Sequence, residues 1–305
     1  MPGSLVFGTF HFVRGENRLA QTPACTESAF FDLVEDFYSK GILASSEDFN
    51  ELRKNGTKNL ISKPNKTVFF TFDDGYIEHY DFCADVLEQF NSRGLFFPVV
   101  NSLVKRTVLD VNVIQIICSN EKYSYIAKEW LARQELVKNP LINSSSFSPA
   151  IYDDSNIRYI KRHLQSSPDL LEMLEIDTSL ISQVLEDNLD YFNNLYFDYN
   201  QACDLHARGH ILGGHSKTHS WLTRLQPDAL ESELRASLSL IKDVSANKEE
   251  RVTFFCYPYG LTNKNVSNQA LSHFNYCFTT EFGLLNSGIS KEIPRVDVNE
   301  LREFL

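Results

Sequence analysis

The stretch Lys66-Thr67-Val68-Phe69-Phe70-Thr71-Phe72-Asp73-Asp74-Gly75 decides how this sequence is interpreted. Its first part is apolar, β-branched and aromatic, which predicts a buried strand. Two adjacent ionised carboxylates inside a core would repel each other and lose their hydration, so we expect the pair to face a cleft and a cation. The following glycine is expected to supply the turn that brings both side chains to one side. The alternative is an Asp-rich turn that caps a helix.

Strand-like and helical patterns alternate on both sides of this stretch. The strand-like runs are 5–13, 95–100, 210–214, 251–260, 276–280 and 293–298, and the helical runs are 26–40, 79–93, 191–208, 227–243 and 265–273. This alternation is typical of βα units with a parallel sheet. It predicts an α/β fold of about seven strands in a barrel or strongly curved sheet, with its chemistry at the C-terminal strand ends. The residues at such ends are Asp73, Asp74, His215, His219 and Tyr259.

The alternation is interrupted between residues 103 and 190. The interruption has helical periodicity, for example over 121–137 and 157–164, and a Ser/Pro-rich break at 143–149. We therefore expect a single domain over residues 5–305 that contains a helical insertion at 103–190.

Composition excludes several classes of partner and favours one compartment. The net charge of −11 over 305 residues argues against nucleic acid as a main partner. No apolar run approaches the ~20 residues of a membrane span. No signal peptide is visible in the sequence. A signal peptide that preceded the opening Met-Pro-Gly-Ser and was removed stays an open alternative. The six cysteines form no CxxC pair and are expected to be free thiols, which favours a reducing, cytoplasmic location.

A pair of histidines suggests a metal site. His215 and His219 are four positions apart after a Gly-Gly pair, and on a helical turn both rings would reach one ion. With one carboxylate of the Asp73–Asp74 pair they form a 2-His-1-carboxylate set, which leaves positions for water and substrate. The second carboxylate could take a proton from an activated water, so hydrolysis of a polarised carbonyl is implied. Non-haem iron oxygenases use the same ligand set, but on all-β folds that this alternation disfavours.

Three motifs, in this order, resemble those of the NodB-like polysaccharide deacetylases (carbohydrate esterase family four). They are Thr-Phe-Asp-Asp-Gly at 71–75, His-Ser-Lys-Thr-His at 215–219 and Tyr-Pro-Tyr-Gly at 257–260. The resemblance covers residues 5–100 and 195–300 and leaves out the insertion. It implies a deformed (β/α) barrel and metal-dependent removal of N- or O-acetyl groups from sugars.

The resemblance also assigns roles to individual residues. It implies that Asp73 is the general base and that Asp74, His215 and His219 bind the metal. The metal would most often be Zn²⁺, with Co²⁺, Ni²⁺ or Mn²⁺ as alternatives. The backbone N–H of Tyr259 would help to stabilise the oxyanion.

The sequence departs from the family pattern at three places. Cys256 stands where the family often has an arginine that orients the base, and we hypothesise that Arg295 replaces it from the last strand. An Asp-x-x-Asp-Trp motif and the C-terminal Leu-x-His motif that usually supplies the general acid are missing. Phe-His-Phe-Val at 10–13 resembles the N-terminal motif of the exopolysaccharide branch, whose barrel is circularly permuted, which makes His11 the candidate acid. Four other histidines are expected to be structural or solvated: His79, His206, His210 and His273.

The sequence favours an N-deacetylase that acts on an acetylated sugar of a surface glycan or of its precursor. The precursor could be nucleotide-linked or lipid-linked. Two alternatives stay open: a deformylase or amidase on a non-glycan amide, because the site contacts only a carbonyl, and a glycan-binding protein with an inactive site.

Overall fold

The structure is a computed structural model that describes residues 4–15, 25–134, 155–166, 168–245, 252–286 and 290–304. The chain separates into two compact units, one of Met1–Thr107 with Leu195–Leu305 and one of Val108–Asn194. The expected start of the insertion, residue 103, lies inside helix α4 (Val100–Lys105) of the first unit.

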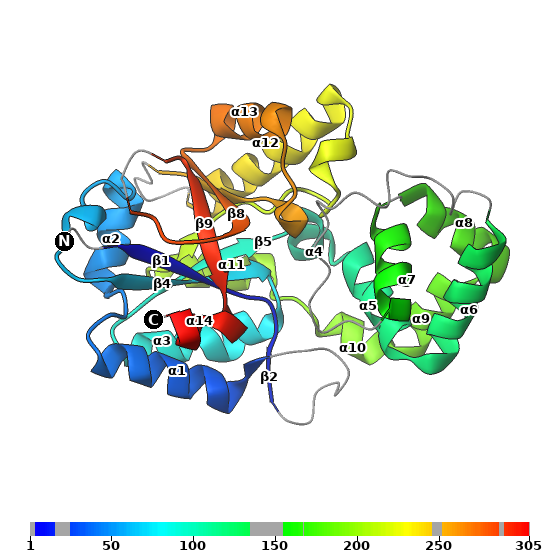
Figure 1. The fold of residues 1–305 in the computed structure, drawn as a ribbon, viewed down its shortest axis with the longest axis horizontal. Helices are drawn as coiled ribbons and strands as arrows, with labels where there is room; N and C mark the ends of the chain where they lie inside the picture. The colour runs from blue at the N-terminus through cyan, green and yellow to red at the C-terminus, as the bar shows by residue number, and fades with distance from the viewer. Residues whose placement is uncertain are drawn as a thin grey trace. The chain divides into compact units, whose positions relative to one another are not determined.

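Seven parallel strands form the sheet of the first unit (Figure 1), in the order β6-β5-β4-β1-β9-β8-β7. The outer strands β6 and β7 meet at one parallel bridge, where Gly214 N donates to Phe254 O (2.9 Å) and Cys256 N donates to Gly214 O (2.8 Å). The sheet is thus nearly closed, and the predicted deformed (β/α) barrel is confirmed. The strands are β1 (Leu5–Phe10), β4 (Thr67–Asp74), β5 (Gly94–Pro98), β6 (Ile211–Leu212), β7 (Phe254–Cys256), β8 (Tyr276–Phe282) and β9 (Glu292–Asp297).

Helices surround this sheet, with α12 and α13 on one side of it and α1 and α3 on the opposite side (Figure 1). A second, two-stranded parallel sheet is formed by β2 (Val13–Arg14) and β3 (Cys25–Thr26), which lie between β1 and α1 in the sequence. The helices of this unit, besides α4, are α1 (Glu27–Ser39), α2 (Ser46–Asn55), α3 (Ala84–Gln89), α11 (Tyr199–Ala207), α12 (Pro227–Val244), α13 (Lys264–His273) and α14 (Val298–Phe304).

Several predicted elements differ from the structure; the strand expected over 5–13, for example, ends at Phe10. The helix expected over 191–208 is two helices, α10 (Leu189–Asn193) and α11, because Asp198 caps a new helix by accepting from Gln201 N (2.9 Å). The strand expected over 251–260 is limited to Phe254–Cys256, since Pro258 begins a 3₁₀ turn (Pro258–Gly260).

The described residues of the second unit form helices joined by short loops, and none of them forms a strand. Its buried side chains include Ile114, Leu131 and Leu174, which form an apolar interior. The Trp130 indole donates to Asp177 (2.7 Å). None of the helices described in either unit is both long and apolar enough to cross a membrane. The helices of the second unit are α5 (Asp110–Ser119), α6 (Glu121–Arg133), α7 (Ser155–Ser166), α8 (Pro168–Thr178), α9 (Leu180–Asp187) and α10.

The barrel interior is filled by alternate residues of the strands. Phe7 of β1, Phe69 of β4, Phe97 of β5 and Phe278 of β8 belong to one buried cluster, whereas Phe70 of β4 packs outward with the helices. A strand buried on both faces is expected of a parallel sheet covered by helices. Every second residue along each strand therefore points into the barrel, and this alternation continues to the C-terminal ends of the strands.

His210 is a buried structural histidine whose titration should be measurable. Its Nδ1 accepts from Gly94 N (3.0 Å) and its Nε2 donates to Glu88 (2.9 Å), so the neutral ring has both partners. Burial lowers the pKa of His210 to about 4, despite the nearby Glu88. The unfolded chain binds this proton near pH 6.5, so protons favour unfolding between about pH 6.5 and 4.

We expect the free energy of unfolding to fall by about 2 kcal/mol for this group between pH 7 and pH 5. His210→Asn keeps an acceptor for Gly94 N and removes the titration, so its stability should fall less over the same interval. Urea unfolding of both proteins at the two pH values measures the difference. Equal losses in the two proteins would show that His210 does not carry this acid sensitivity.

Candidate active site

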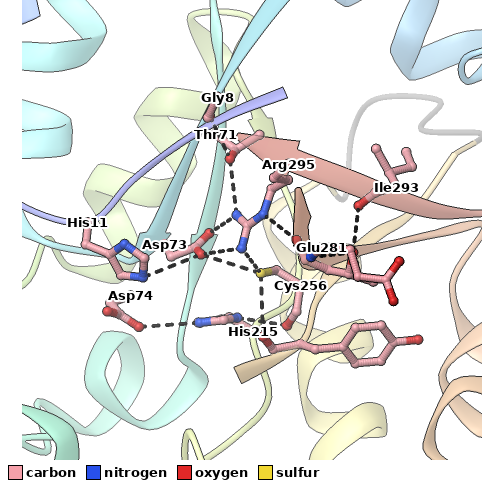
Figure 2. A network of polar contacts seen from close by, with 12 residues as sticks. Gly8, His11, Thr71, Asp73, Asp74, His215, Cys256, Glu281, Ile293 and Arg295 are labelled. Carbon is pink, nitrogen blue, oxygen red and sulfur yellow. Dashed lines mark hydrogen bonds and ion pairs between the residues drawn. The ribbon is translucent and has the colours of Figure 1, made fainter. Parts of the chain in front are cut away.

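Three side chains from three strands meet at the C-terminal end of the barrel interior (Figure 2). Asp73 is four residues beyond the inward-facing Phe69, Cys256 is two beyond Phe254, and Arg295 is two beyond Ile293. The two-residue period of a strand therefore places all three on the inner face. All three side chains are buried.

Arg295 holds Asp73 with two parallel hydrogen bonds, from Nη1 to Oδ1 and from Nη2 to Oδ2, both 2.8 Å. The guanidinium also donates to Thr279 O (3.1 Å), Thr71 Oγ1 (3.2 Å) and Cys256 Sγ (3.1 Å). Burial raises the pKa of Asp73, but the charge and hydrogen bonds of Arg295, together with the nearby histidines His215 and His11, outweigh burial and bring the pKa to about 2. Asp73 is thus an oriented carboxylate that is ionised at neutral pH.

His11 lies directly after β1, beside the same carboxylate. Its Nε2 is 3.8 Å from Asp73 Oδ2, and about half of its side chain is exposed (51%). The buried ring of His79 donates to the carbonyl oxygen of His11. The structure thus brings an accessible imidazole next to the candidate base.

Asp74 turns its carboxylate out of the strand direction through its own backbone. Its φ of 70° is in the left-handed region, so the turn begins at Asp74, one residue earlier than predicted. Its Oδ1 lies 3.4 Å from His215 Nε2 and 3.2 Å from His219 Nε2. The Tyr76 hydroxyl donates to Oδ2 (3.0 Å).

The two histidines meet on a loop, and the predicted helical turn is wrong. Residues 215–220 have no helical structure, and Ser216 and His219 have φ values of 64° and 61°. Ser216 Oγ accepts from His219 N (2.9 Å), and the two imidazole centroids are 5.0 Å apart. His215 Nδ1 donates to Cys256 O (2.8 Å), which directs Nε2 toward Asp74.

The chemistry of these donors fits a divalent metal. Asp74 Oδ1, His215 and His219 offer three buried ligand atoms within 4.8 Å of one another. Asp74 Oδ1 accepts no hydrogen bond from any residue that the structure describes. Ligands bound at 2.0–2.2 Å in a tetrahedral site lie about 3.3–3.6 Å apart, close to the separations seen here. Asp73, His215 and Cys256 form a second cluster, but Arg295 already contacts Asp73 and Cys256 and disfavours a cation there.

The tyrosine of the third motif lies beside the metal-type site. Tyr259 has a φ of 57° in its turn, and its ring centroid is 4.6 Å from that of His219 and 5.9 Å from that of Trp221. Gly260 has a φ of 65°, and a Cβ there would lie 1.9 Å from Thr280 Oγ1. Only glycine fits at this position, which explains why the Tyr-Pro-Tyr-Gly motif ends in glycine.

Two polar residues near the site were not identified from sequence. Thr279 supplies a carbonyl to Arg295, which no side-chain pattern indicates. Glu233 lies on α12 beside Leu230 and Leu234, and all three are buried. A carboxylate on the apolar face of a helix is a usable signal, because buried charges require partners.

Comparisons with known proteins agree with this site and fold. Residues 180–276 match the family model described as polysaccharide deacetylase. That range contains His215, His219 and Tyr259, whereas Asp73 and Arg295 lie outside it. No curated protein matches the sequence.

Solved deacetylases share the fold at low sequence identity. The Streptococcus pyogenes deacetylase PplD, solved with acetate, is 12% identical with a TM-score of 0.58, over 98% of this chain and 93% of that one. IcaB from Ammonifex degensii is 16% identical with a TM-score of 0.57, over 99% and 95%. A de-N-acetylase from Aggregatibacter actinomycetemcomitans is 14% identical with a TM-score of 0.55, over 99% and 100%. The predicted resemblance to NodB-like polysaccharide deacetylases is confirmed.

Proposed function

We propose that this chain, which resembles the polysaccharide deacetylases in its family match and its fold, is a metal-dependent sugar deacetylase. Its substrate would be an acetylated sugar of a surface glycan or of a glycan precursor, with an N-acetyl or O-acetyl group as the target. One observation carries the proposal: the Arg295-bound carboxylate of Asp73 lies beside the buried donors Asp74, His215 and His219. The six free cysteines support a cytoplasmic location.

The residues divide the reaction among them. A divalent metal held by Asp74, His215 and His219 would supply a Lewis acid for the carbonyl and lower the pKa of the attacking water. Asp73 accepts the proton of that water as the carbon–oxygen bond forms, and Arg295 keeps the carboxylate aimed. Tyr259 N–H donates to the developing oxyanion. His11 then donates a proton to the leaving nitrogen as the carbon–nitrogen bond breaks, which yields acetate and a free amine.

A substrate panel tests this proposal. We expect acetate and free amine in equal amounts from at least one of three N-acetylhexosamine substrates: a nucleotide-linked sugar, a lipid-linked sugar or an oligomer. Metal chelation should abolish the release and added zinc should restore it. Release of formate from N-formyl compounds alone would favour the deformylase alternative. Glycan binding by the zinc-loaded protein without turnover of any member would favour a binding protein.

A further inference from the structure

We infer that Glu233 is a positioning residue that holds the metal-binding loop, residues 215–219, in the shape that lets both histidines reach Asp74. This inference rests on the proposed function and deepens it. Glu233 belongs to none of the three motifs, and it contacts neither histidine in any bond described for it.

Glu233 accepts three hydrogen bonds from the middle of this loop. Its Oε2 accepts from Lys217 N (2.7 Å) and from Thr218 N (2.9 Å), and its Oε1 accepts from the Thr218 hydroxyl (2.9 Å). Ser220 Oγ lies 2.7 Å from the same hydroxyl, so it can donate to Thr218. Glu233 as a whole residue is only 7% exposed, and hydrogen bonds to a charged acceptor are stronger than neutral ones.

The same loop is held from its other side by the first turn of α4. Val100 N donates to Ser216 O (3.2 Å), and Asn101 N donates to Lys217 O (3.0 Å). These two amides have no partner inside their helix, so the loop carbonyls satisfy them. The loop thus receives donors from α4 and gives its own N–H groups to Glu233, which leaves it little freedom between the two histidines.

Close packing of α12 brings Glu233 to the loop. A Cβ on Gly214 would lie 2.7 Å from Ser237 Cβ, so the absence of a side chain lets this helix approach the end of β6. Ser237 is fully buried and one helical turn beyond Glu233. Ile241, one further helical turn along α12, is also buried.

The loop needs this support because its backbone is unfavourable. Ser216 and His219 both have left-handed φ values, and such conformations cost of order 1 kcal/mol or more for a residue with a side chain. Without Glu233, two half-buried amides lose their acceptors and the loop can relax into ordinary backbone geometry. The two imidazoles would then no longer both lie close to Asp74. Zinc affinity is therefore expected to depend on Glu233, although Glu233 is not a ligand.

Zinc affinity, measured by competition with a chromophoric chelator, tests the inference directly. We expect Glu233→Ala to weaken zinc binding by about tenfold or more, in the range seen when partners outside the ligand shell are removed. Glu233→Gln keeps one acceptor oxygen, so its zinc affinity should lie between those of the wild type and Glu233→Ala. Hydrogen exchange of the Lys217 and Thr218 amides in metal-free protein should be slow in the wild type and fast in Glu233→Ala.

Leu240→Ala is the matched control for lost helix packing. It removes a buried side chain from the other half of α12 and should lower the melting temperature without changing zinc affinity. If wild type binds zinc and Glu233→Ala binds it within twofold, the positioning role is wrong and the proposed function stands. If wild type binds no zinc, the metal-dependent function fails and the positioning role fails with it. Equal zinc losses in Glu233→Ala and Leu240→Ala would make Glu233 a general stability residue.

Discussion

Replacing Asp73 with asparagine is expected to lower the rate of deacetylation by about 10²–10⁴-fold while zinc binding is retained. The amide has nearly the shape of the carboxylate but cannot accept the proton of the attacking water. It also presents an N–H group to Arg295, which donates to both Asp73 oxygens in the wild type. The measurement is kcat with the best acetylated sugar, together with the zinc content of each protein.

The zinc content is the internal control for Asp73→Asn. Because Asp74, His215 and His219 are unchanged, the variant should hold the same amount of zinc as the wild type. A variant with full zinc and more than a tenth of the wild-type rate would show that Asp73 is not the base. Loss of zinc in the variant would instead place Asp73 among the metal ligands.

Replacing Arg295 with methionine is expected to affect both stability and activity. It leaves the buried Asp73 carboxylate without its two main hydrogen bonds, and breaking a buried pair costs about 3–5 kcal/mol. Arg295→Lys keeps the charge but cannot make two parallel bonds, so it should lie between wild type and Arg295→Met in both properties. Urea unfolding measures the stability of each variant, and kcat of the folded proteins measures its activity.

A double variant separates the pair from general damage at Arg295. In Arg295→Met with Asp73→Asn no unpaired charge is buried, so we expect it to be more stable than Arg295→Met alone. Additive losses in the double variant would mean that the two side chains do not act as a pair. Full activity in Arg295→Lys would contradict the role of two-point contact in aiming the base.

The barrel and the site were predictable where sequence and geometry are directly coupled. The alternation of strand and helix patterns gave the parallel architecture because each pattern has its own period. The meeting of Arg295 and Asp73 follows from the same period, since both continue the inner face of their strands from Ile293 and Phe69. The structure places the two in contact, whereas the role of Arg295 in orienting a base stays a prediction.

Other features depend on backbone conformations that residue type does not reveal. The left-handed φ of Asp74 and His219 is unusual for residues with side chains, so neither the early turn nor the loop geometry was foreseen. The four-residue spacing of the histidines suggested a helix, but the loop instead donates hydrogen bonds to Glu233 and accepts them from the amides of α4. Those partners are distant in sequence, and one-dimensional patterns carry little information on such contacts.

The central claim is that Asp74, His215 and His219 hold a catalytic metal. Elemental analysis of wild type and Asp74→Ala, with acetate release measured on the same samples, tests it most directly. We expect about one zinc per wild-type chain together with acetate release, and loss of both in Asp74→Ala. A wild-type protein without metal, or a variant that keeps both the metal and the activity, would contradict the claim.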